Sequence, residues 1–359
     1  MLTDLRHSLH QHPGLSGNEF FAHDLIVDFL GRYCNADKLY DHVGGYGVIA
    51  VWGSRPAAPT VAFRADIDAL PIGHRCGHDG HTAILLRLAQ LLSEHRAQLL
   101  ERSNVILIFQ PEEETGQGSQ KILDSGILQQ YNILRIYALH NIPGYPEGEV
   151  LLNRHTFAAA SSGVIYRLEG RPTHASTPEK GLNPGIAVAE IIQHFSRFNS
   201  NPATTTSRAF TQSTLICARV GEEAFGTSAG MAEVMFTLRA FTNDNMERLL
   251  HEAETVAHQA AERHHLQFSS ALVDPFRATE NNSLLVEDLE RRLCNIPCRY
   301  HYLLEPFRWS EDFANYLTLF PGVLFGIGAG EKHPELHHPD YDFPDGLIEP
   351  AAQIFYSLI

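Results

Sequence analysis

The order of the predicted strands and helices changes near residue 163, and this change constrains the fold more than any other feature of the chain. Before it, short apolar runs alternate with helical stretches, a pattern that indicates an α/β sheet with parallel members. A continuous apolar run such as Val105 to Phe109 is typical of a strand buried on both faces. The strands expected here are Val48 to Trp52 and Thr60 to Arg64, separated by a Gly/Pro/Ala turn, and then Val105 to Phe109 and Ile133 to Leu139.

Two helical stretches accompany these strands. Residues 1–30 have apolar repeats that are interrupted at His12-Pro13-Gly14. A second helix is predicted to begin at His81, because the apolar side chains that follow recur on one helical face. They are Ile84, Leu85, Leu88, Leu91 and Leu92.

Beyond residue 163 the predicted order is strand, helix, strand, strand, helix, strand, which is typical of a ferredoxin-like unit. The expected elements are Val164 to Leu168, Asn183 to Phe198, Ser213 to Val220, Ala232 to Ala240, Asn243 to His264, and Leu266 to Val273. Because α/β sequence lies on both sides, we expect residues 163–275 to be an inserted α+β domain. Residues 1–162 and 276–359 then form one discontinuous α/β domain with a mixed, mostly parallel sheet flanked by helices.

Composition excludes some classes of partner. A chain of 359 residues can form a large core or two domains. Its net charge of −15 argues against nucleic acid or an acidic membrane surface, since both need a basic face. No apolar run approaches the roughly 18–20 residues of a membrane span, and we expect no signal peptide. Five widely spread cysteines, an odd number, suggest reduced thiols and a cytoplasmic protein.

The segment Cys76-Gly77-His78-Asp79-Gly80-His81 brings a thiol and two imidazoles into one short turn. Cys and His side chains favour borderline-soft divalent metals. Cys76 and His78 are two residues apart, so both can point to one side of an extended or turn segment. Two ligands do not make a site, and the rest of the chain has to supply more.

Four further segments carry polar side chains, three of them directly after predicted strands. They are Arg64-Ala65-Asp66-Ile67-Asp68-Ala69-Leu70-Pro71, Phe109-Gln110-Pro111-Glu112-Glu113-Glu114-Thr115-Gly116, Leu139-His140-Asn141, and Glu335-Leu336-His337-His338-Pro339. Open α/β sheets place their sites at the carboxyl ends of strands. Taken singly, a histidine there is more often structural and an acidic cluster more often a solvated face. Together the segments offer a thiolate, three imidazoles and a carboxylate, with one carboxylate spare, which suits two divalent ions and a bound water.

Motifs along the whole chain carry a family resemblance. They are Leu9-His10-Gln11-His12-Pro13 with Glu19, the RADxDALP segment at Arg64, CGHDGH at Cys76, FQPxEE at Phe109, Gly170 to Pro178, Ser310-Glu311-Asp312-Phe313, and LHxP at Leu336. In these the chain resembles the amidohydrolase branch of the dinuclear-metal aminoacylase/carboxypeptidase peptidase family. That branch includes hippurate hydrolase, auxin-conjugate hydrolase and N-acetyl-diaminopimelate deacetylase.

The resemblance implies a set of metal ligands and a general base. The ligands are Cys76, His78, Glu114, His140 and His337. Glu113 matches the family's general acid/base, which takes a proton from a metal-bound water and later delivers it to the leaving amine. Asp68 is expected to orient a ligand, as metal-bound histidine usually requires.

The resemblance also makes the inserted domain a lid and dimerisation domain. His174 matches a histidine that stabilises the tetrahedral intermediate, often from the partner subunit, although it could be only a surface histidine. Arg239 could pair with a substrate carboxylate or form a strand-end salt bridge. Ser310, Glu311 and Asp312 are expected to line the substrate pocket. An edge strand of the lid predicts a homodimer or a higher homo-oligomer.

The chain departs from the family pattern in three places. Relatives usually carry a loop of about twenty residues between Pro71 and Cys76, and only four residues remain here. The Asn-Val-Ile-Pro-Asp stretch of the family lid is replaced by Phe225 to Met231. Glu112 stands where most relatives have alanine, which adds a third negative charge beside the expected metals.

Two further patterns are set aside. Gly326-Ile327-Gly328-Ala329-Gly330 resembles a dinucleotide fingerprint, but no helix is expected after it, so we expect a glycine turn that approaches substrate. Cys294-Asn295-Ile296-Pro297-Cys298 lacks a second ligand pair at zinc-knuckle spacing, so ordinary thiols are expected.

The sequence therefore predicts a cytoplasmic amidohydrolase with two divalent ions per chain that cleaves N-acyl amino acids, such as acetyl or benzoyl derivatives. Manganese or zinc is expected, with cobalt or nickel as alternatives. A dipeptidase or aminopeptidase on the same scaffold is the nearest alternative. A non-catalytic binding protein with the same fold is the other.

Overall fold

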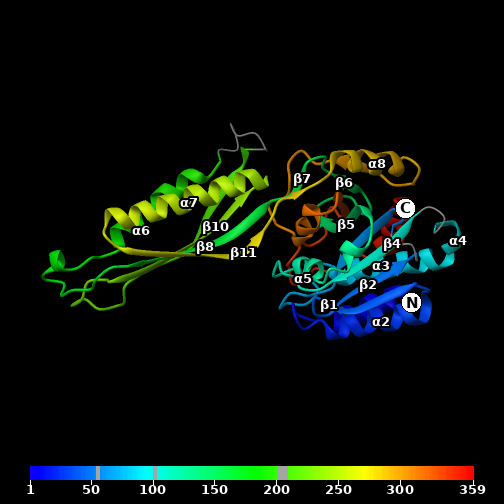
Figure 1. Cartoon of the computed structure of the whole chain (residues 1–359), viewed down its shortest axis with the longest axis horizontal. Helices are drawn as coiled ribbons and strands as arrows, with labels where there is room; N and C mark the ends of the chain where they lie inside the picture. The colour runs from blue at the N-terminus through cyan, green and yellow to red at the C-terminus, as the bar shows by residue number, and fades with distance from the viewer. Residues whose placement is uncertain (54–56, 100–102, 201–208) are drawn as a thin grey trace. The chain divides into compact units, whose positions relative to one another are not determined.

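The computed structural model describes residues 1–53, 57–99, 103–200 and 209–359, and these form two compact units (Figure 1). The first unit comprises Met1–Phe157, Thr279–Leu304 and Glu311–Ile359, and the second comprises Ala158–Ala278 and Glu305–Ser310. Residues 305–310 therefore pack with the second unit, although the sequence placed them with the first. Residues 54–56 of the turn expected between the first two strands lie outside the described residues.

The first unit is built on an eight-stranded sheet in the order β1-β2-β4-β3-β5-β14-β6-β13. Its strands are β1 (Lys38–Val43), β2 (Gly47–Trp52), β3 (Thr60–Asp66), β4 (Asn104–Gln110), β5 (Ile133–Pro143), β6 (Val150–Leu152), β13 (Tyr300–Tyr302) and β14 (Gly322–Gly330). The central strands β4, β3, β5 and β14 run parallel to one another, and every residue of β3 and β4 is buried. The predicted α/β class with a mixed, mostly parallel sheet is confirmed.

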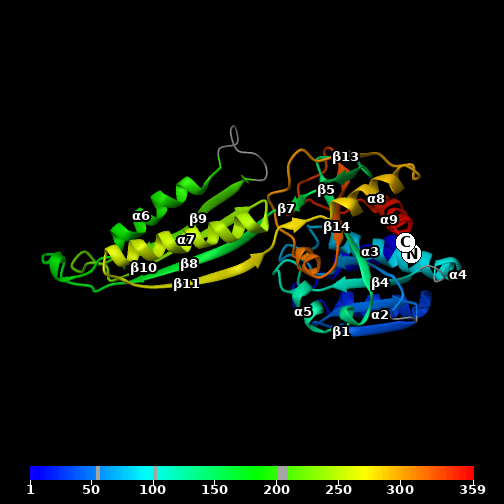
Figure 2. The same ribbon diagram turned by 45° about the horizontal axis from the view of Figure 1, so that its top comes forward.

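Helices flank this sheet (Figures 1 and 2). They are α1 (Leu2–Gln11), α2 (Phe20–Tyr33), α3 (His78–Glu94), α4 (Arg96–Leu99), α5 (Gly118–Asp124), α8 (Ser283–Leu293) and α9 (Ile348–Ser357). The helix expected from His81 begins three residues earlier, at His78. Gly77 precedes it with a φ of +89°, and a β-carbon there would lie 2.6 Å from the Asn141 side chain, so glycine is required. This start places His78 and His81 one helical turn apart.

The second unit is a four-stranded antiparallel sheet in the order β11-β8-β10-β9, with α6 and α7 on one face (Figure 2). The elements are β8 (Ala160–Glu169), α6 (Gly185–Phe195), β9 (Thr211–Val220), β10 (Met231–Ala240), α7 (Asn243–Arg263) and β11 (Gln267–Phe276). Alternate β8 residues Val164, Tyr166 and Leu168 are buried beneath the helices. The predicted inserted ferredoxin-like domain is confirmed.

Short elements complete the chain. They are the two-stranded sheet of β7 (Thr156–Ala158) and β12 (Thr279–Glu280), and the 3-10 helices Leu128–Gln130, Pro178–Lys180, Ser196–Phe198, Asp312–Thr318 and Asp345–Leu347. Within the described ranges, no helix combines the length and apolar character needed to cross a membrane.

Candidate metal centre

The side chains that the resemblance assigns to metal binding come from loops and termini at one end of the first unit's sheet. Glu114 lies in the loop after β4, His140 lies in β5, and His337 follows β14. Cys76 and His78 stand at the start of α3. Parallel strands end together at one edge of a sheet, so residues far apart in sequence meet there.

Two groups of ligand-type atoms share Glu114. Cys76, Glu114 and His337 each offer one atom within 4.8 Å of the others, and Cys76 Sγ lies 2.8 Å from His337 Nε2. His78, Glu113 and Glu114 form a second such group, with His78 Nε2 lying 3.8 Å from Glu114 Oε1. A carboxylate common to two adjacent groups is an arrangement that can bridge two ions.

Buried polar atoms support the fit of divalent ions to this site. His78 Nε2 and Glu114 Oε1 are buried and have no hydrogen-bond partner within the described part of the chain. A buried polar atom without a partner costs free energy, and a cation would satisfy both atoms. The donor set of thiol, imidazole and carboxylate suits zinc, manganese and their neighbours.

His140 lies edge-on to His78, with ring centroids 6.1 Å apart. Burial, and then the neighbouring His81, lower the pKa of His140 to about 3. The imidazole is therefore neutral at pH 7, as a metal ligand must be.

The protonation of His78 differs from that of His140. Burial alone would lower the pKa of His78, but Asp66 and Asp68 outweigh it and raise that pKa well above its usual value. An ion that binds Nε2 of His78 therefore has to displace a proton.

Asp68 holds two of the ligand-bearing residues in place. Its Oδ1 lies 3.3 Å from Nδ1 of His78, which also donates to the Asp68 carbonyl oxygen at 3.0 Å. Its Oδ2 accepts hydrogen bonds from Ser16 Oγ and from the backbone N–H of Glu114. With Nδ1 engaged, Nε2 of His78 is left to face Glu113 and Glu114.

Glu113 is nearly fully buried at the edge of this centre. Burial is the largest cause that raises the pKa of its carboxyl well above the usual range, and the charges of Glu311 and Glu114 add to it. Its Oε1 accepts a long hydrogen bond, 3.4 Å, from the backbone N–H of Asp312. A carboxyl group whose pKa is raised holds a proton more readily than an exposed one, which suits a group that accepts and returns a proton.

Arg64 organises the carboxylates behind the centre, a role that sequence reasoning missed. Its side chain is 2% exposed and donates to Gln110, to Asp66 at 2.7 Å and to Asp312 at 2.8 Å. It also forms an ion pair with Glu311 at 2.9 Å. Arg64 opens the RADxDALP segment, but nothing in the sequence indicates that its side chain meets residues near position 311.

His81, the last residue of the CGHDGH motif, has a protein partner at each ring nitrogen. Its Nδ1 donates to Asp66 Oδ1 at 2.6 Å, and its Nε2 accepts from the backbone N–H of Asn141 at 3.3 Å. Both ring nitrogens are engaged by the protein, so His81 braces α3 against β5.

The expected substrate-contacting residues lie in both units. In the second unit His174 is exposed, and its Nδ1 accepts from the hydroxyl and the backbone N–H of Ser176, which leaves the proton on Nε2. Arg239 donates to the Arg308 carbonyl at 2.7 Å and to Ser310 Oγ at 3.2 Å. In the first unit the carboxylate of Glu311 is 1% exposed and held by Arg64.

The shortened segment before Cys76 forms a tight connection. The backbone N–H of Gly73 donates to the Leu70 carbonyl, and that of His337 donates to the Arg75 carbonyl at 2.9 Å. His337 has a φ of +66°, a strained value for a residue with a β-carbon. Arg75, the last of the four remaining residues, therefore contacts the segment that presents His337.

The two patterns set aside have structural explanations. Gly326 to Gly330 lie within β14 and form no turn, and the expected approach of this segment to substrate stays a prediction. A β-carbon on Gly328 would lie 2.0 Å from the Pro146 carbonyl oxygen, so glycine allows close packing there. The thiols of Cys294 and Cys298 donate to the carbonyls of Glu290 and Leu293.

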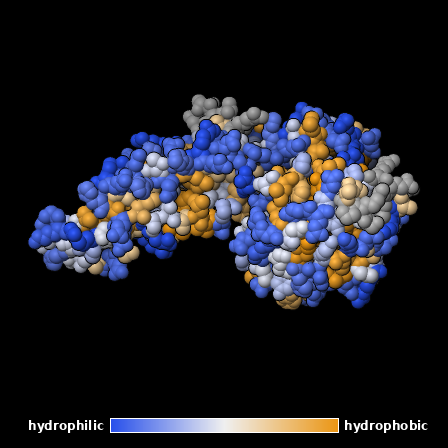
Figure 3. All heavy atoms as spheres, viewed as in Figure 1, coloured by the Kyte–Doolittle hydropathy of each residue, from blue (hydrophilic) through white to orange (hydrophobic). Residues whose placement is uncertain are grey.

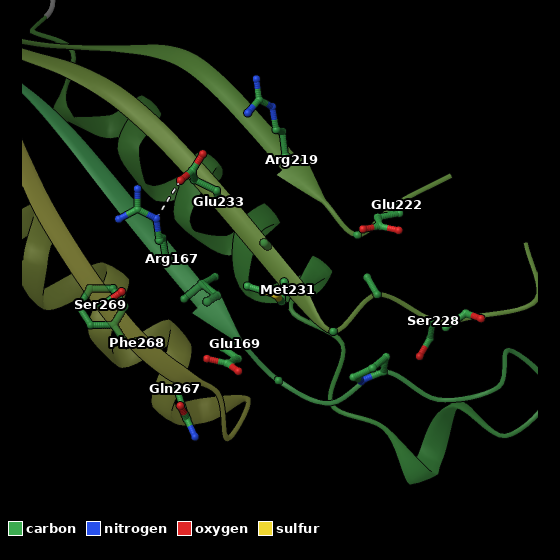
Figure 4. A pocket seen from close by; sticks show the side chains of 18 of the residues that line it. Arg167, Glu169, Arg219, Glu222, Ser228, Met231, Glu233, Gln267, Phe268 and Ser269 are labelled. Atoms are coloured by element: carbon green, nitrogen blue, oxygen red, sulfur yellow. Dashed lines mark hydrogen bonds and ion pairs between the residues drawn. The ribbon is translucent and has the colours of Figure 1, made fainter. Parts of the chain in front are cut away.

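A cavity of about 870 Å³ lies on the second unit, at one end of its sheet (Figure 4). Its charged lining includes Arg167, which pairs with Glu233 at 2.9 Å, together with Glu169, Arg219 and Glu222. None of its lining residues is a histidine or cysteine, and all of them belong to the second unit.

Comparisons with known proteins show what the whole chain is similar to. Over 99% of its length the chain is 27% identical to N-acetylcysteine deacetylase of Bacillus subtilis, of which 95% is covered. It is 29% identical to IAA-amino acid hydrolase ILR1-like 5 of Arabidopsis thaliana, covering 99% of this chain and 85% of that protein. The crystal structure of Bacillus subtilis YxeP, described as a dinuclear metal binding peptidase from the M20 family, is 25% identical. It superposes with a TM-score of 0.85 over 99% of this chain and 96% of that one.

The family follows from a match that covers most of the chain. Residues 62–359 match peptidase family M20/M25/M40. With the full-length relatives and the ligand groups that share Glu114, this shows that the chain belongs to peptidase family M20/M25/M40, a family of metal-dependent hydrolases that act on amide bonds.

Proposed function

We propose that this protein is a two-metal amidohydrolase that releases a free amino acid from its N-acyl derivative, with an acetyl, benzoyl or similar acyl group. The single observation that carries the proposal is the position of Glu113, a buried carboxyl that lies with His78 in one of the two groups that share Glu114. The names of the relatives, a deacetylase and an amino acid conjugate hydrolase, support an N-acyl amino acid as substrate.

In this proposal Cys76, His78, Glu114, His140 and His337 hold the ions. Manganese or zinc suits these donors, and cobalt or nickel are alternatives. When bound, such ions polarise the amide carbonyl and activate water. Glu113 takes the proton of the attacking water and returns it to the leaving amine. Asp68 keeps the His78 ring in the orientation that ligation needs.

Residues of the second unit are proposed to contact the substrate. His174 has its proton on Nε2, so it can donate to the oxygen that becomes negative in the tetrahedral intermediate. For Arg239 no carboxylate partner is found among the described residues, and its side chain is proposed to pair with the substrate carboxylate. Ser310 and Glu311 are proposed to line the same pocket, Glu311 while held by Arg64.

We further propose a homodimer formed through β9, with location in the cytoplasm. β9 is an edge strand of the second unit and exposes Leu215, Ile216 and Val220. Figure 3 shows hydrophobic side chains gathered on the surface of this unit. The cytoplasmic assignment rests on five cysteines that are all free thiols.

The variant Glu113→Gln tests the catalytic role. Because glutamine cannot accept the proton, turnover should fall by roughly 10²- to 10⁴-fold. Metal content, measured by elemental analysis, should stay that of the wild type. The control is Glu112→Gln, which removes the neighbouring charge that Lys121 already neutralises at 2.7 Å and should keep most of the activity. Near-normal turnover of Glu113→Gln would exclude Glu113 as the base.

A substrate panel separates the alternatives. Chelator-stripped protein is assayed with N-acetyl amino acids, N-benzoyl amino acids and free dipeptides, with manganese, zinc or cobalt added. Turnover of acylated substrates supports the proposal. Turnover of free dipeptides alone would identify a dipeptidase, and silence with two bound ions would favour a binding protein.

A further inference from the structure

A second cluster of metal-type ligands lies in the first unit, on residues outside the proposed catalytic set. His23 of α2 and Asp41 and His42 of β1 each offer one ligand atom, and these atoms lie within 4.8 Å of one another. Asp41 and His42 are exposed, whereas His23 is 4% exposed. Two imidazoles and one carboxylate so close to one another are a donor set for a borderline divalent ion.

A β-bulge brings the two strand residues to this point. The pairing of β1 with β2 shifts register between Tyr40 and Val43, and His42 has a φ of +51°. In a regular strand consecutive side chains point to opposite faces. The extra residue of the bulge allows Asp41 and His42 both to present an atom near His23.

The neighbouring residue Asp24 orients the His23 ring for metal binding. Its Nδ1 lies 2.9 Å from Asp24 Oδ1, so the ring donates its N–H to that carboxylate and carries the lone pair on Nε2. This Nε2 is buried and has no hydrogen-bond partner among the residues that the structure describes. A histidine whose other nitrogen donates to a carboxylate is the usual arrangement of a metal ligand.

We propose that His23, Asp41 and His42 bind one divalent ion of the zinc type, in addition to the ions of the catalytic centre. The His23 and His42 rings are stacked with centroids 4.1 Å apart, so His42, which is exposed, turns its ring on binding. Water completes the coordination. The ion joins α2 to β1 and serves a structural purpose.

Zinc binding to chelator-stripped full-length protein tests the proposal. Stoichiometry is measured by equilibrium dialysis and elemental analysis, and affinity by competition with a chromophoric chelator. His42→Ala should bind one zinc ion fewer per chain than the wild type, with amide hydrolysis unchanged. Asp24→Asn should keep the ion and weaken its affinity by roughly 10- to 100-fold.

The matched control is His258→Ala, an exposed histidine on α7 with one carboxylate, Glu262, 3.7 Å away. It should retain every zinc ion. Zinc should also raise the urea midpoint of the wild type more than that of His42→Ala, because ligand binding to the folded state stabilises it. Equal stoichiometry in the wild type and His42→Ala would overturn the proposal, as would an equal loss in His258→Ala, which would indicate adventitious surface binding.

Discussion

Several ionisable side chains are buried in the first unit. Glu19 is one of them and lies outside the proposed set of metal ligands. Its carboxylate is fully buried and accepts hydrogen bonds from the backbone N–H groups of Gly17 and Glu112. Burial nevertheless raises the pKa of Glu19 from 4.5 to about 7. The folded protein therefore holds this proton over a pH range in which the unfolded chain has released it.

This pKa predicts the pH dependence of stability. Between pH 4.5 and about 7 the folded state binds more protons than the unfolded state, so the free energy of unfolding falls as pH rises, by about 3 kcal/mol from this group. Glu19→Gln cannot titrate and should remove that part of the slope. Urea unfolding from pH 4.5 to 8, in the presence of a chelator, measures this slope. The control is Glu262→Gln, which removes one charge at an exposed position. Parallel pH curves for the wild type and Glu19→Gln would refute the prediction.

At the level of elements, one arginine connects α1 to distant parts of the first unit. Arg6 is 2% exposed and pairs with Asp79 of α3 at 3.1 Å, with Asp342 at 2.5 Å and with Asp345 at 2.7 Å. Asp79 is fully buried in the motif that carries His78. The placement of α1 and the start of α3 are therefore coupled through one ion-pair network.

Removal of this arginine should be costly. Arg6→Met removes the permanent charge beside the buried carboxylate of Asp79 and leaves it His10, whose Nδ1 lies 2.8 Å away, so we expect a loss of roughly 3–5 kcal/mol in the free energy of unfolding. Arg32→Met is the matched control, because Arg32 on α2 is exposed and, among the residues that the structure describes, pairs with Asp28 alone, one helical turn away. It should cost no more than about 1 kcal/mol. Equal urea midpoints for the two variants would contradict a dominant buried network.

For the whole molecule, the two edge strands of the second unit differ in what they offer a second copy. Near its end β11 contains Pro275 and has Asp274 at a φ of +44°, and both features disfavour pairing at that edge. β9 contains no proline and exposes apolar side chains along its length. The proposed dimer is therefore assigned to β9.

Sedimentation velocity tests this assignment. The wild type should be a dimer at micromolar concentration. Ile216→Lys places a charge on β9 at a residue that is 59% exposed and should shift the protein to monomer. Leu272→Lys, at a 58% exposed residue of β11, should remain a dimer. A monomeric wild type would exclude the dimer, and dissociation by Leu272→Lys alone would move the interface to β11.

Local patterns predicted many of the elements, but not β1, β6 or β13 of the large sheet. Apolar runs and periodicities identified the strands β2 to β5 and the order of elements in the second unit, because burial of one face or both faces leaves a repeat within a few residues. The sequence also identified the types of residue in the ligand groups, because few thiols, imidazoles and carboxylates stand at the ends of strands. The three-residue error at the start of α3 arose because Gly77 allows a left-handed residue directly before His78.

Tertiary structure alone decided which of these side chains meet. Glu114 belongs to two ligand groups, His81 has both nitrogens engaged, and Arg64 holds Glu311 and Asp312 because of where the strand ends lie. The bulge that joins Asp41 and His42 to His23 leaves no sequence repeat either. Sequence periodicity reports the burial of a residue within its own element, whereas contacts between residues more than 200 positions apart depend on how the strands are ordered in the sheet.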